Sequence, residues 1–256
     1  MTNKFLSYLL LIFSLVITGC ASRGSYEFGD FNQVGDRAPI LKQSSHAQRI
    51  VIIGGNRGIG LETAKLAIER GHQVTIVSRN PSNVNLSHSN LNTQSGSILS
   101  AQSMQSVLAE HDVVISAIGL PAGSSNVTLF SKGIQNVISA MQLHQINRLL
   151  TISAIGAGDS KGHGGWWFDW FLQPFVLTSD INDKTRQEEL VKATELNFTI
   201  IRPAILTEQP ARNRYRVIQD YRGIETGKIA RADVALFLIA SIENSLYIRK
   251  TVVISD

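Results

Sequence analysis

The sequence predicts one α/β domain built on a doubly wound, mainly parallel sheet with helices on both faces. Two observations support this prediction. Residues 49–80 contain an apolar run, a glycine-rich turn, a helical stripe and a second apolar run, which together form a complete strand–helix–strand unit. Apolar runs and amphipathic segments then continue to alternate towards Asp256, as in an α/β sheet.

The expected elements follow one another at short intervals. Strands are predicted where short apolar runs occur, and helices where apolar residues recur with a period of three to four. Gly71, after the basic Arg70, is the expected cap at the end of the first helix. The expected strands are 50–53, 74–77, 112–116, 149–153, 198–201 and 252–254, and the expected helices are 61–68, 101–109, 129–144 and 231–242.

The first strand–helix junction is a candidate binding site. Backbone without Cβ atoms can approach a diphosphate closely, and free N–H groups at a helix start carry partial positive charge. A purely structural turn is the alternative. The junction predicts dinucleotide binding through Gly54, Asn56, Arg57, Gly58, Ile59 and Gly60.

The end of the second strand predicts which dinucleotide binds. NAD-selective sites usually place a carboxylate there for the ribose hydroxyls, but this chain has Ser78, Arg79 and Asn80. Arginine suits a 2′-phosphate because its planar fork of donors matches phosphate oxygens. With Arg57 as a second cation, Arg79 favours NADP(H) over NAD(H); the alternative is that Arg79 is a solvated residue at a strand end.

These residues resemble the short-chain dehydrogenase/reductase superfamily. The resemblance is to its atypical NAD(P)H-binding branch, which includes NmrA-like proteins and biliverdin reductase B (flavin reductase), and it covers 49–256. In place of the Gly-Asp usual near adenine, this chain has Gly96 and Ser97 followed by Ile98. The resemblance assigns Ser97 and Ile98 to the cofactor site and places Ser153 in the turn after the fifth strand, where it could hydrogen-bond a substrate carbonyl or the nicotinamide amide. The alternative for Ser153 is a serine whose hydrogen bonds are satisfied within the turn.

The segment 180–210 strengthens the resemblance. Lys184 falls at the lysine of the family's Tyr-x-x-x-Lys motif, while Asp180 stands at the tyrosine position. Without the tyrosine, the alcohol–ketone chemistry of typical members is not expected. By resemblance, Lys184 binds the nicotinamide ribose and Pro203 covers the nicotinamide, and the candidate catalytic residues are Ser153 and Lys184. An exposed lysine at a helix start is the alternative for Lys184.

Two further segments bear on ligand binding. The strand at 112–116 is followed by Ala117, Ile118 and Gly119, at the carboxyl end of the strand, where ligands of open α/β sheets bind. We expect these residues to leave a gap that admits the cofactor; the alternative is a plain exit from strand to loop. The segment 162–178 holds all three tryptophans. It is an aromatic wall for a flat substrate, a cap over the sheet or a patch at a lipid interface.

The basic segment 212–222 is expected to be a solvated surface strand. The alternative is that it contacts an anionic substrate.

The first nineteen residues are typical of a secretory signal. Lys4 precedes an apolar run, 5–17, that is shorter than the roughly twenty residues needed to span a bilayer. Cys20 is the only cysteine, and the preceding Ile-Thr-Gly resembles the lipobox of bacterial lipoproteins. A buried or incidental cysteine is the alternative. We therefore expect a signal peptide at 1–19, a lipidated Cys20 with a polar tether at 20–48, and an NAD(P)-binding domain at 49–256.

Composition narrows the function further. The net charge of +4 is mild and its signs are scattered, which does not indicate a nucleic-acid surface. No metal site is expected, and we expect a monomer. The leading hypothesis is an oxidoreductase that transfers a hydride from NADPH to a planar acceptor such as a flavin, quinone or tetrapyrrole.

The expected location raises an alternative function. A lipid-anchored domain in the bacterial cell envelope would face the periplasm, with the outer membrane favoured, and soluble NADPH is not expected there. The alternative function is a non-catalytic lipoprotein that uses the fold for binding or scaffolding. An unprocessed N-terminus that leaves the domain membrane-anchored and facing the cytosol is the alternative location.

Overall fold

The protein is described by a computed structural model. By its internal contacts Val34–Asp256 forms one compact unit, separate from Met1–Gln33, and every described residue belongs to it. The predicted signal peptide, Cys20 and nearly all of the tether lie outside the described residues. These comprise 36–37, 46–121, 124, 127–164, 169–170, 177–221 and 224–256.

A sheet of nine strands forms the centre of the unit Val34–Asp256, with strand order β1-β9-β11-β7-β6-β5-β2-β3-β4. The pairs from β11 to β4 are parallel, while β9 joins β11, and β1 joins β9, in antiparallel register. A separate parallel pair joins β8 to β10. The strands are β1 (Asp36–Arg37), β2 (Arg49–Ile53), β3 (Gln73–Ser78), β4 (Leu91–Ser95), β5 (Val113–Ser116), β6 (Arg148–Ile152), β7 (Asn197–Pro203), β8 (Ile205–Thr207), β9 (Arg216–Ile218), β10 (Lys228–Ala230) and β11 (Lys250–Ser255).

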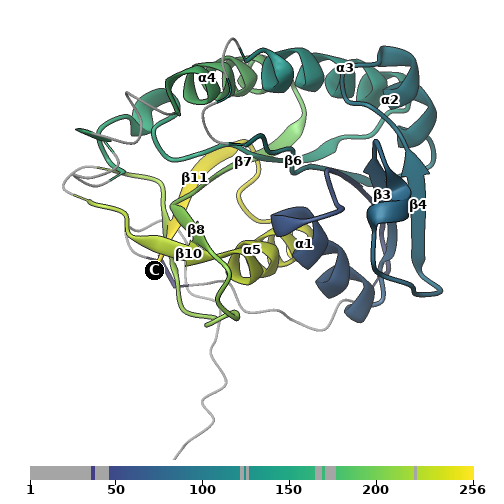
Figure 1. Ribbon diagram of the computed structural model, residues 1–256, viewed down its shortest axis with the longest axis horizontal. Coiled ribbons are helices and arrows are strands. Elements are labelled where there is room, and N and C mark those ends of the chain that lie inside the picture. Colours follow the sequence, from purple (N-terminus) through teal and green to yellow (C-terminus); the bar gives the residue numbers. More distant parts are fainter. Residues whose placement is uncertain are drawn as a thin grey trace, which may run out of the picture. The chain divides into compact units, whose positions relative to one another are not determined.

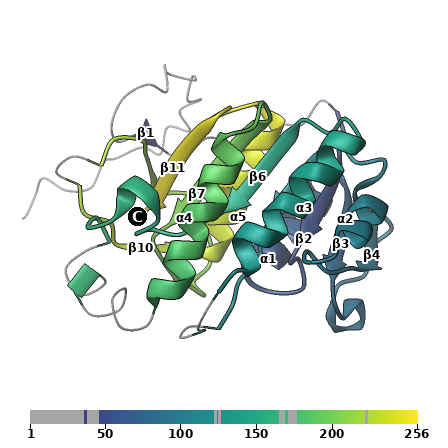
Figure 2. The same ribbon diagram turned by 90° about the horizontal axis from the view of Figure 1, so that it is seen from above.

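Helices cover both faces of this sheet (Figures 1 and 2). Helices α2, α3 and α4 pack on one face, and α1 and α5 pack on the other (Figure 1). On each face the helix side chains form an apolar cluster with the strands, and the two clusters are separate. The doubly wound fold is therefore confirmed. The helices are α1 (Gly58–Glu69), α2 (Ala101–Leu108), α3 (Leu129–Leu143), α4 (Thr178–Lys192) and α5 (Arg231–Glu243), with short 3-10 turns η1 (Pro81–Asn83) and η2 (Gly158–Ser160).

The central strands are buried on both faces, as their apolar runs predict. Ile50, Val51 and Ile52 are all fully buried, and alternate residues of β2 enter the two opposite clusters. Helix α1 ends as expected, with Gly71 in the left-handed region at φ +85° and its N–H donating to Ile68 O at 2.9 Å. Only glycine adopts this conformation without strain.

One segment differs from the prediction for a solvated strand. Within 212–222, β9 pairs with β11 and extends the sheet, and Tyr215, Val217 and Ile218 are buried. The arginines on either side hid this apolar content, which is spread over too few residues to show a period. No helix in the described part of the chain is long and apolar enough to cross a membrane.

Candidate functional site

The order of the strands places the candidate site. Strands β3 and β4 lie on one side of β2, and β5, β6 and β7 lie on the other, so the direction of winding reverses between β2 and β5. In open α/β sheets ligands bind at the carboxyl ends of the strands that flank such a reversal. Gly54 follows β2 and Ala117 follows β5, so the structure brings the two predicted segments together at this point.

The glycine turn is tightly packed against its neighbours. A Cβ added to Gly60 would lie 2.4 Å from Gly54 O, and one added to Gly54, whose φ is +89°, would lie 2.8 Å from Ala117 O and 3.2 Å from Ile118 Cδ1. No side chain fits at these two positions unless the backbone shifts. Gly58 opens α1 at φ +58°. The turn therefore has the bare backbone and helix N-terminus that a diphosphate requires.

Three arginines lie close to this turn or at the next strand end. Arg57 is the residue before α1, Arg79 follows β3, and both are exposed. Neither makes an ion pair or a side-chain hydrogen bond with another described residue, so both guanidiniums are available to a phosphate. The third is Arg231, the first residue of α5. Its Nε lies 3.5 Å from the position of a Cβ on Gly58, and its Nη1 pairs with Glu208.

The other predicted cofactor residues lie in different surroundings. Ser97 Oγ accepts from Leu99 N at 3.3 Å in the loop before α2. Ile98 is 7% exposed and packs on Gly133 of α3, where an added Cβ would lie 2.9 Å from Ile98, so its side chain belongs to the core. Gly119 is exposed, whereas Pro203 is buried at the end of β7 beside Ile254.

Ser153 belongs to a buried polar network at the end of β6. Its Oγ donates to Glu188 Oε1 at 2.6 Å, and Arg202 holds the same carboxylate through Nε at 2.8 Å and Nη2 at 2.5 Å. All three residues are at most 3% exposed. Because the Ser153 proton is donated to Glu188, its oxygen remains as an acceptor.

Lys184 is buried rather than exposed, which rules out the alternative of a surface lysine. It is 8% exposed, its Nζ donates to Ile152 O at 3.1 Å, and the ammonium lies 4.1 Å from the centre of the Phe130 ring. Burial lowers the pKa of Lys184 to about 8, against the opposing effect of Glu188. The lysine is therefore fixed at the end of β6, next to Ser153.

Asp180 lies one helical turn before Lys184 on the same face of α4. It is 8% exposed, and its Oδ1 is buried without a hydrogen-bond partner among the described residues. Burial raises the pKa of Asp180 above its ordinary value, while the Lys184 ammonium lowers it in part. Ser153, Lys184 and Asp180 thus line one end of β6 and the start of α4.

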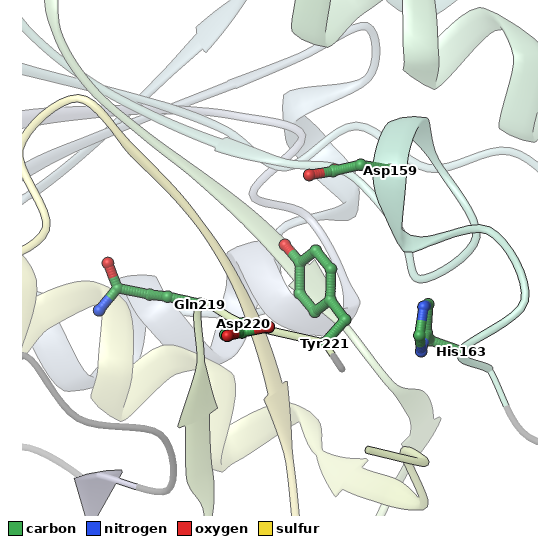
Figure 3. Close-up of a pocket in the computed structure, with 5 residues that line it drawn as sticks. All are labelled: Asp159, His163, Gln219, Asp220 and Tyr221. Carbon is green, nitrogen blue, oxygen red and sulfur yellow. The ribbon is translucent and has the colours of Figure 1, made fainter. Parts of the chain in front are cut away.

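A hollow lies beside this network (Figure 3). It has a volume of about 490 Å³ and is lined by side chains from η2 with its following loop and from the end of β9, namely Asp159, His163, Gln219, Asp220 and Tyr221. Asp159 Oδ1 and the Tyr221 hydroxyl both contact Arg202 Nη1, at 2.5 and 3.1 Å. Arg202 therefore links the hollow to Glu188 and Ser153.

Two parts of this arrangement were not predicted from the sequence. Arg202 is fully buried in a strand of apolar residues, and a charged residue in such a run is the signal that could have identified it. Arg231 carried no signal, because its place beside Gly58 depends on the packing of α5 next to α1. The tryptophans Trp166 and Trp167 lie outside the described residues, whereas Trp170 is described and is 69% exposed.

Comparison with known sequences supports a nicotinamide cofactor. The sequence profile of a family described as NAD(P)H-binding matches residues 54–245. A protein of Bacillus subtilis (strain 168), named as an uncharacterized sugar epimerase, YhfK, is 30% identical over 134 residues. That match covers 50% of this chain and 56% of the relative, so the chain spans about half the length of the curated relative that it matches.

Solved structures of low identity share the fold. A short-chain dehydrogenase/reductase from Veillonella parvula DSM 2008 in complex with NADP has a TM-score of 0.69 at 15% identity, over 82% of this chain and 95% of that chain. ChuY from Escherichia coli O157:H7, named as an anaerobillin reductase, has a TM-score of 0.68 at 18% identity, over 81% of this chain and 96% of that chain. At these identities the likeness shows the fold alone.

Proposed function

The chain belongs to the NAD(P)H-binding family, and from that premise we propose that it is an NADPH-dependent reductase of a planar acceptor such as a flavin, quinone or tetrapyrrole. One observation carries the proposal. The glycine turn lies at the reversal between β2 and β5, and the buried Ser153 and Lys184 lie at the end of β6, the next strand. This arrangement would give the diphosphate and the nicotinamide separate places along one sheet edge.

The residues near α1 would hold the diphosphate end of the cofactor. The backbone N–H groups at the start of α1 face the diphosphate, and Arg231 adds a guanidinium beside Gly58. Arg57 and Arg79, which are exposed and make no ion pair with described residues, suit the 2′-phosphate that distinguishes NADP(H). The preference for NADPH rests on these two side chains.

The residues at the end of β6 would orient the nicotinamide end. Reduced nicotinamide supplies a hydride when it is bound. Because Ser153 Oγ donates to Glu188, it is placed to accept from the carboxamide N–H of nicotinamide rather than to donate to a substrate carbonyl. Lys184 has two N–H bonds beyond the one to Ile152 O, which it can donate to ribose hydroxyls.

The acceptor is proposed to be planar for a chemical reason. A hydride can pass directly between two stacked rings once they are positioned and water is excluded, so this step does not need a tyrosine to polarise a carbonyl group. One protein of this fold, from Escherichia coli, carries the name of a reductase. The site residues assigned above are compatible with such a reaction.

The test is NADPH oxidation by the purified chain with menadione, FMN or biliverdin as acceptor, followed through the nicotinamide absorbance. We expect oxidation that depends on the acceptor and that is lost when Lys184→Met removes the ammonium. Lys132→Met, which changes an exposed lysine of α3, is the matched control and should leave the rate unchanged. Binding of NADPH without oxidation by any acceptor would contradict the reductase and favour the non-catalytic binding module.

A second candidate function comes from the relative named as a sugar epimerase. An epimerase returns the hydride to its substrate, so it causes no net oxidation of NADPH. Interconversion of a nucleotide sugar by the chain, without a change in nicotinamide absorbance, would favour this reaction over the reductase.

We also propose that Cys20 is acylated and anchors the domain to the bacterial cell envelope, facing the periplasm. The proposal rests on the apolar run that ends three residues before Cys20 and on the lack of any second cysteine. Metabolic labelling with a fatty acid should mark the wild-type chain and not Cys20→Ser. Equal labelling of both would contradict the anchor.

A further inference from the structure

Asp180 is a buried carboxyl group whose hydrogen bonding is incomplete. Its Oδ1 has no hydrogen-bond partner in the part of the chain that the structure describes, although only 8% of the residue is exposed to solvent. Asp183, on the same helix, shows the usual arrangement: it accepts from Phe130 N at 2.7 Å, from Ser131 Oγ at 2.5 Å and from Arg186 Nη2 at 3.0 Å. Buried polar atoms are nearly always satisfied, so the bare oxygen of Asp180 needs an explanation.

The position of Asp180 is fixed from two sides. The preceding residue, Ser179, accepts from Val127 N at 2.8 Å, which ties the first turn of α4 to the segment before α3. Four residues later, Lys184 reaches Ile152 O at the end of β6. Asp180 therefore lies about one helical pitch, roughly 5 Å, beyond Lys184 towards the carboxyl edge of the sheet, on the side where the nicotinamide is proposed to bind.

The surroundings of Asp180 favour a protonated carboxyl group. Burial raises the pKa of Asp180, Asp183 raises it further, and only the Lys184 ammonium opposes them among the charges of the described residues that act on it. The same burial lowers the pKa of Lys184 to about 8. Burial thus favours the neutral form of both groups, the protonated acid of Asp180 and the amine of Lys184. A protonated Asp180 can donate its proton, and the Lys184 ammonium would then stabilise the carboxylate that forms.

We propose that Asp180 is the proton donor of the reductase and supplies the second half of the reduction. The inference rests on the proposed function. A bound reduced nicotinamide would supply the acceptor with a hydride, that is two electrons and a proton, which would leave the acceptor as an anion. The O–H bond of Asp180 then breaks, its proton bonds to the acceptor anion, and the carboxylate that remains faces the Lys184 ammonium. Water from the solvent protonates Asp180 again before the next turnover, so charge and protons balance.

The alternative is a structural role for Asp180. A carboxylate in the first turn of a helix interacts favourably with the helix dipole, and its removal would then destabilise the protein. The proposal predicts no loss of stability in Asp180→Asn, because the isosteric amide replaces a carboxyl group that burial prevents from ionising freely. Stability and activity measured together therefore separate the two roles.

The experiment compares the full-length chain with Asp180→Asn, Asp180→Glu and the control Glu189→Gln, which makes the same chemical change at an exposed position of α4. Menadione is the acceptor, and kcat is measured from pH 5 to pH 7, where the Lys184 ammonium, with its pKa of about 8, stays charged. In the wild type, kcat should fall as pH rises and Asp180 loses its proton. Asp180→Asn should lower kcat by about 100-fold or more and abolish this fall, and Asp180→Glu should restore part of both. Glu189→Gln should behave like the wild type.

Two further measurements complete the test. NADPH affinity, from fluorescence, should be the same in Asp180→Asn as in the wild type, and the thermal midpoint of Asp180→Asn at neutral pH should be equal or higher. An unchanged kcat and pH profile in Asp180→Asn would overturn this inference alone, and so would lost activity accompanied by a lower midpoint and lost NADPH binding. A wild-type chain that oxidises no NADPH would overturn the proposed function and this inference together.

Discussion

Two clusters of buried charge lie at opposite edges of the same sheet. The amino-edge cluster consists of Arg70, His72 and Glu243, which join the end of α1 to the end of α5. Arg70 donates to Glu243 at 2.9 and 2.8 Å, and His72 Nε2 lies 3.2 Å from the same carboxylate. Because Gln48 N donates to His72 Nδ1, Nε2 carries the imidazole proton that is donated to Glu243.

The carboxyl-edge cluster consists of Asp180, Lys184, Glu188 and Arg202. Its Glu188–Arg202 pair is as well bonded as the amino-edge cluster. Among the described residues, however, Asp180 Oδ1 has no partner and Lys184 makes a single hydrogen bond, to backbone. The comparison shows that burial of charge has two uses in this fold. Complete pairing fixes elements in place, whereas incomplete pairing at the edge where we propose that the cofactor binds would leave groups able to act on a ligand.

The largest effect on stability is expected from breaking the Glu188–Arg202 ion pair of the carboxyl-edge cluster. Arg202→Met leaves the Glu188 carboxylate buried without its partner, because both residues are at most 1% exposed. We expect a loss of about 3–5 kcal/mol in the free energy of unfolding, measured by urea denaturation. Arg249→Met, at an exposed ion pair with Glu195, is the control and should cause no measurable change. Equal effects of the two variants would show that Glu188 and Arg202 are not buried as described.

The next largest effect is a change of the free energy of unfolding with pH, which the lowered pKa of Lys184 should cause. Its pKa is about 8 in the folded chain and about 10.4 when unfolded. Between these values the unfolded chain holds a proton that the folded chain lacks, so the free energy of unfolding should rise with pH, by roughly 3 kcal/mol in total. Denaturation of the wild type between pH 8 and pH 10.5 should show this rise. Lys184→Met should lack it, and Lys132→Met should keep it; a rise that persists in Lys184→Met contradicts the burial of its ammonium.

A smaller effect is expected at the amino-edge cluster. Glu243→Gln weakens the bonds to Arg70 and His72, but the Arg70 side chain is 21% exposed and can be hydrated. We expect a loss of about 1–3 kcal/mol, below that of Arg202→Met, with unchanged NADPH affinity and turnover. A fall in NADPH affinity without a matching fall in stability would break the division between a structural edge and a ligand edge.

The sequence predicted the fold well because its signals are local. Apolar runs, the glycine turn and Gly71 marked β2, α1 and β3 to within a few residues, and each signal acts within its own element. Strand β9 was missed as part of the sheet because its short length and flanking arginines give no period, and only pairing with β11 reveals its burial.

The candidate site was only partly predictable, because it depends on contacts between distant segments. Lys184 and Ser153 were identified by resemblance, but nothing in the sequence shows that Ser153 donates to Glu188, or that Arg202 holds the same carboxylate. Asp180 was noted as a missing tyrosine, whereas its burial depends on how the start of α4 packs. Such details arise from tertiary packing, which no local pattern encodes.

The central claim is that the glycine turn and its arginines bind NADPH, and fluorescence titration of the full-length chain with NADPH and with NADH tests it most directly. We predict saturable binding of NADPH that is about tenfold or more tighter than that of NADH, which corresponds to roughly 1.4 kcal/mol. This preference should be lost in Arg79→Ala and kept in Arg214→Ala, an exposed arginine of the segment before β9. The absence of NADPH binding at millimolar concentration, or equal affinity for the two cofactors, would contradict the account.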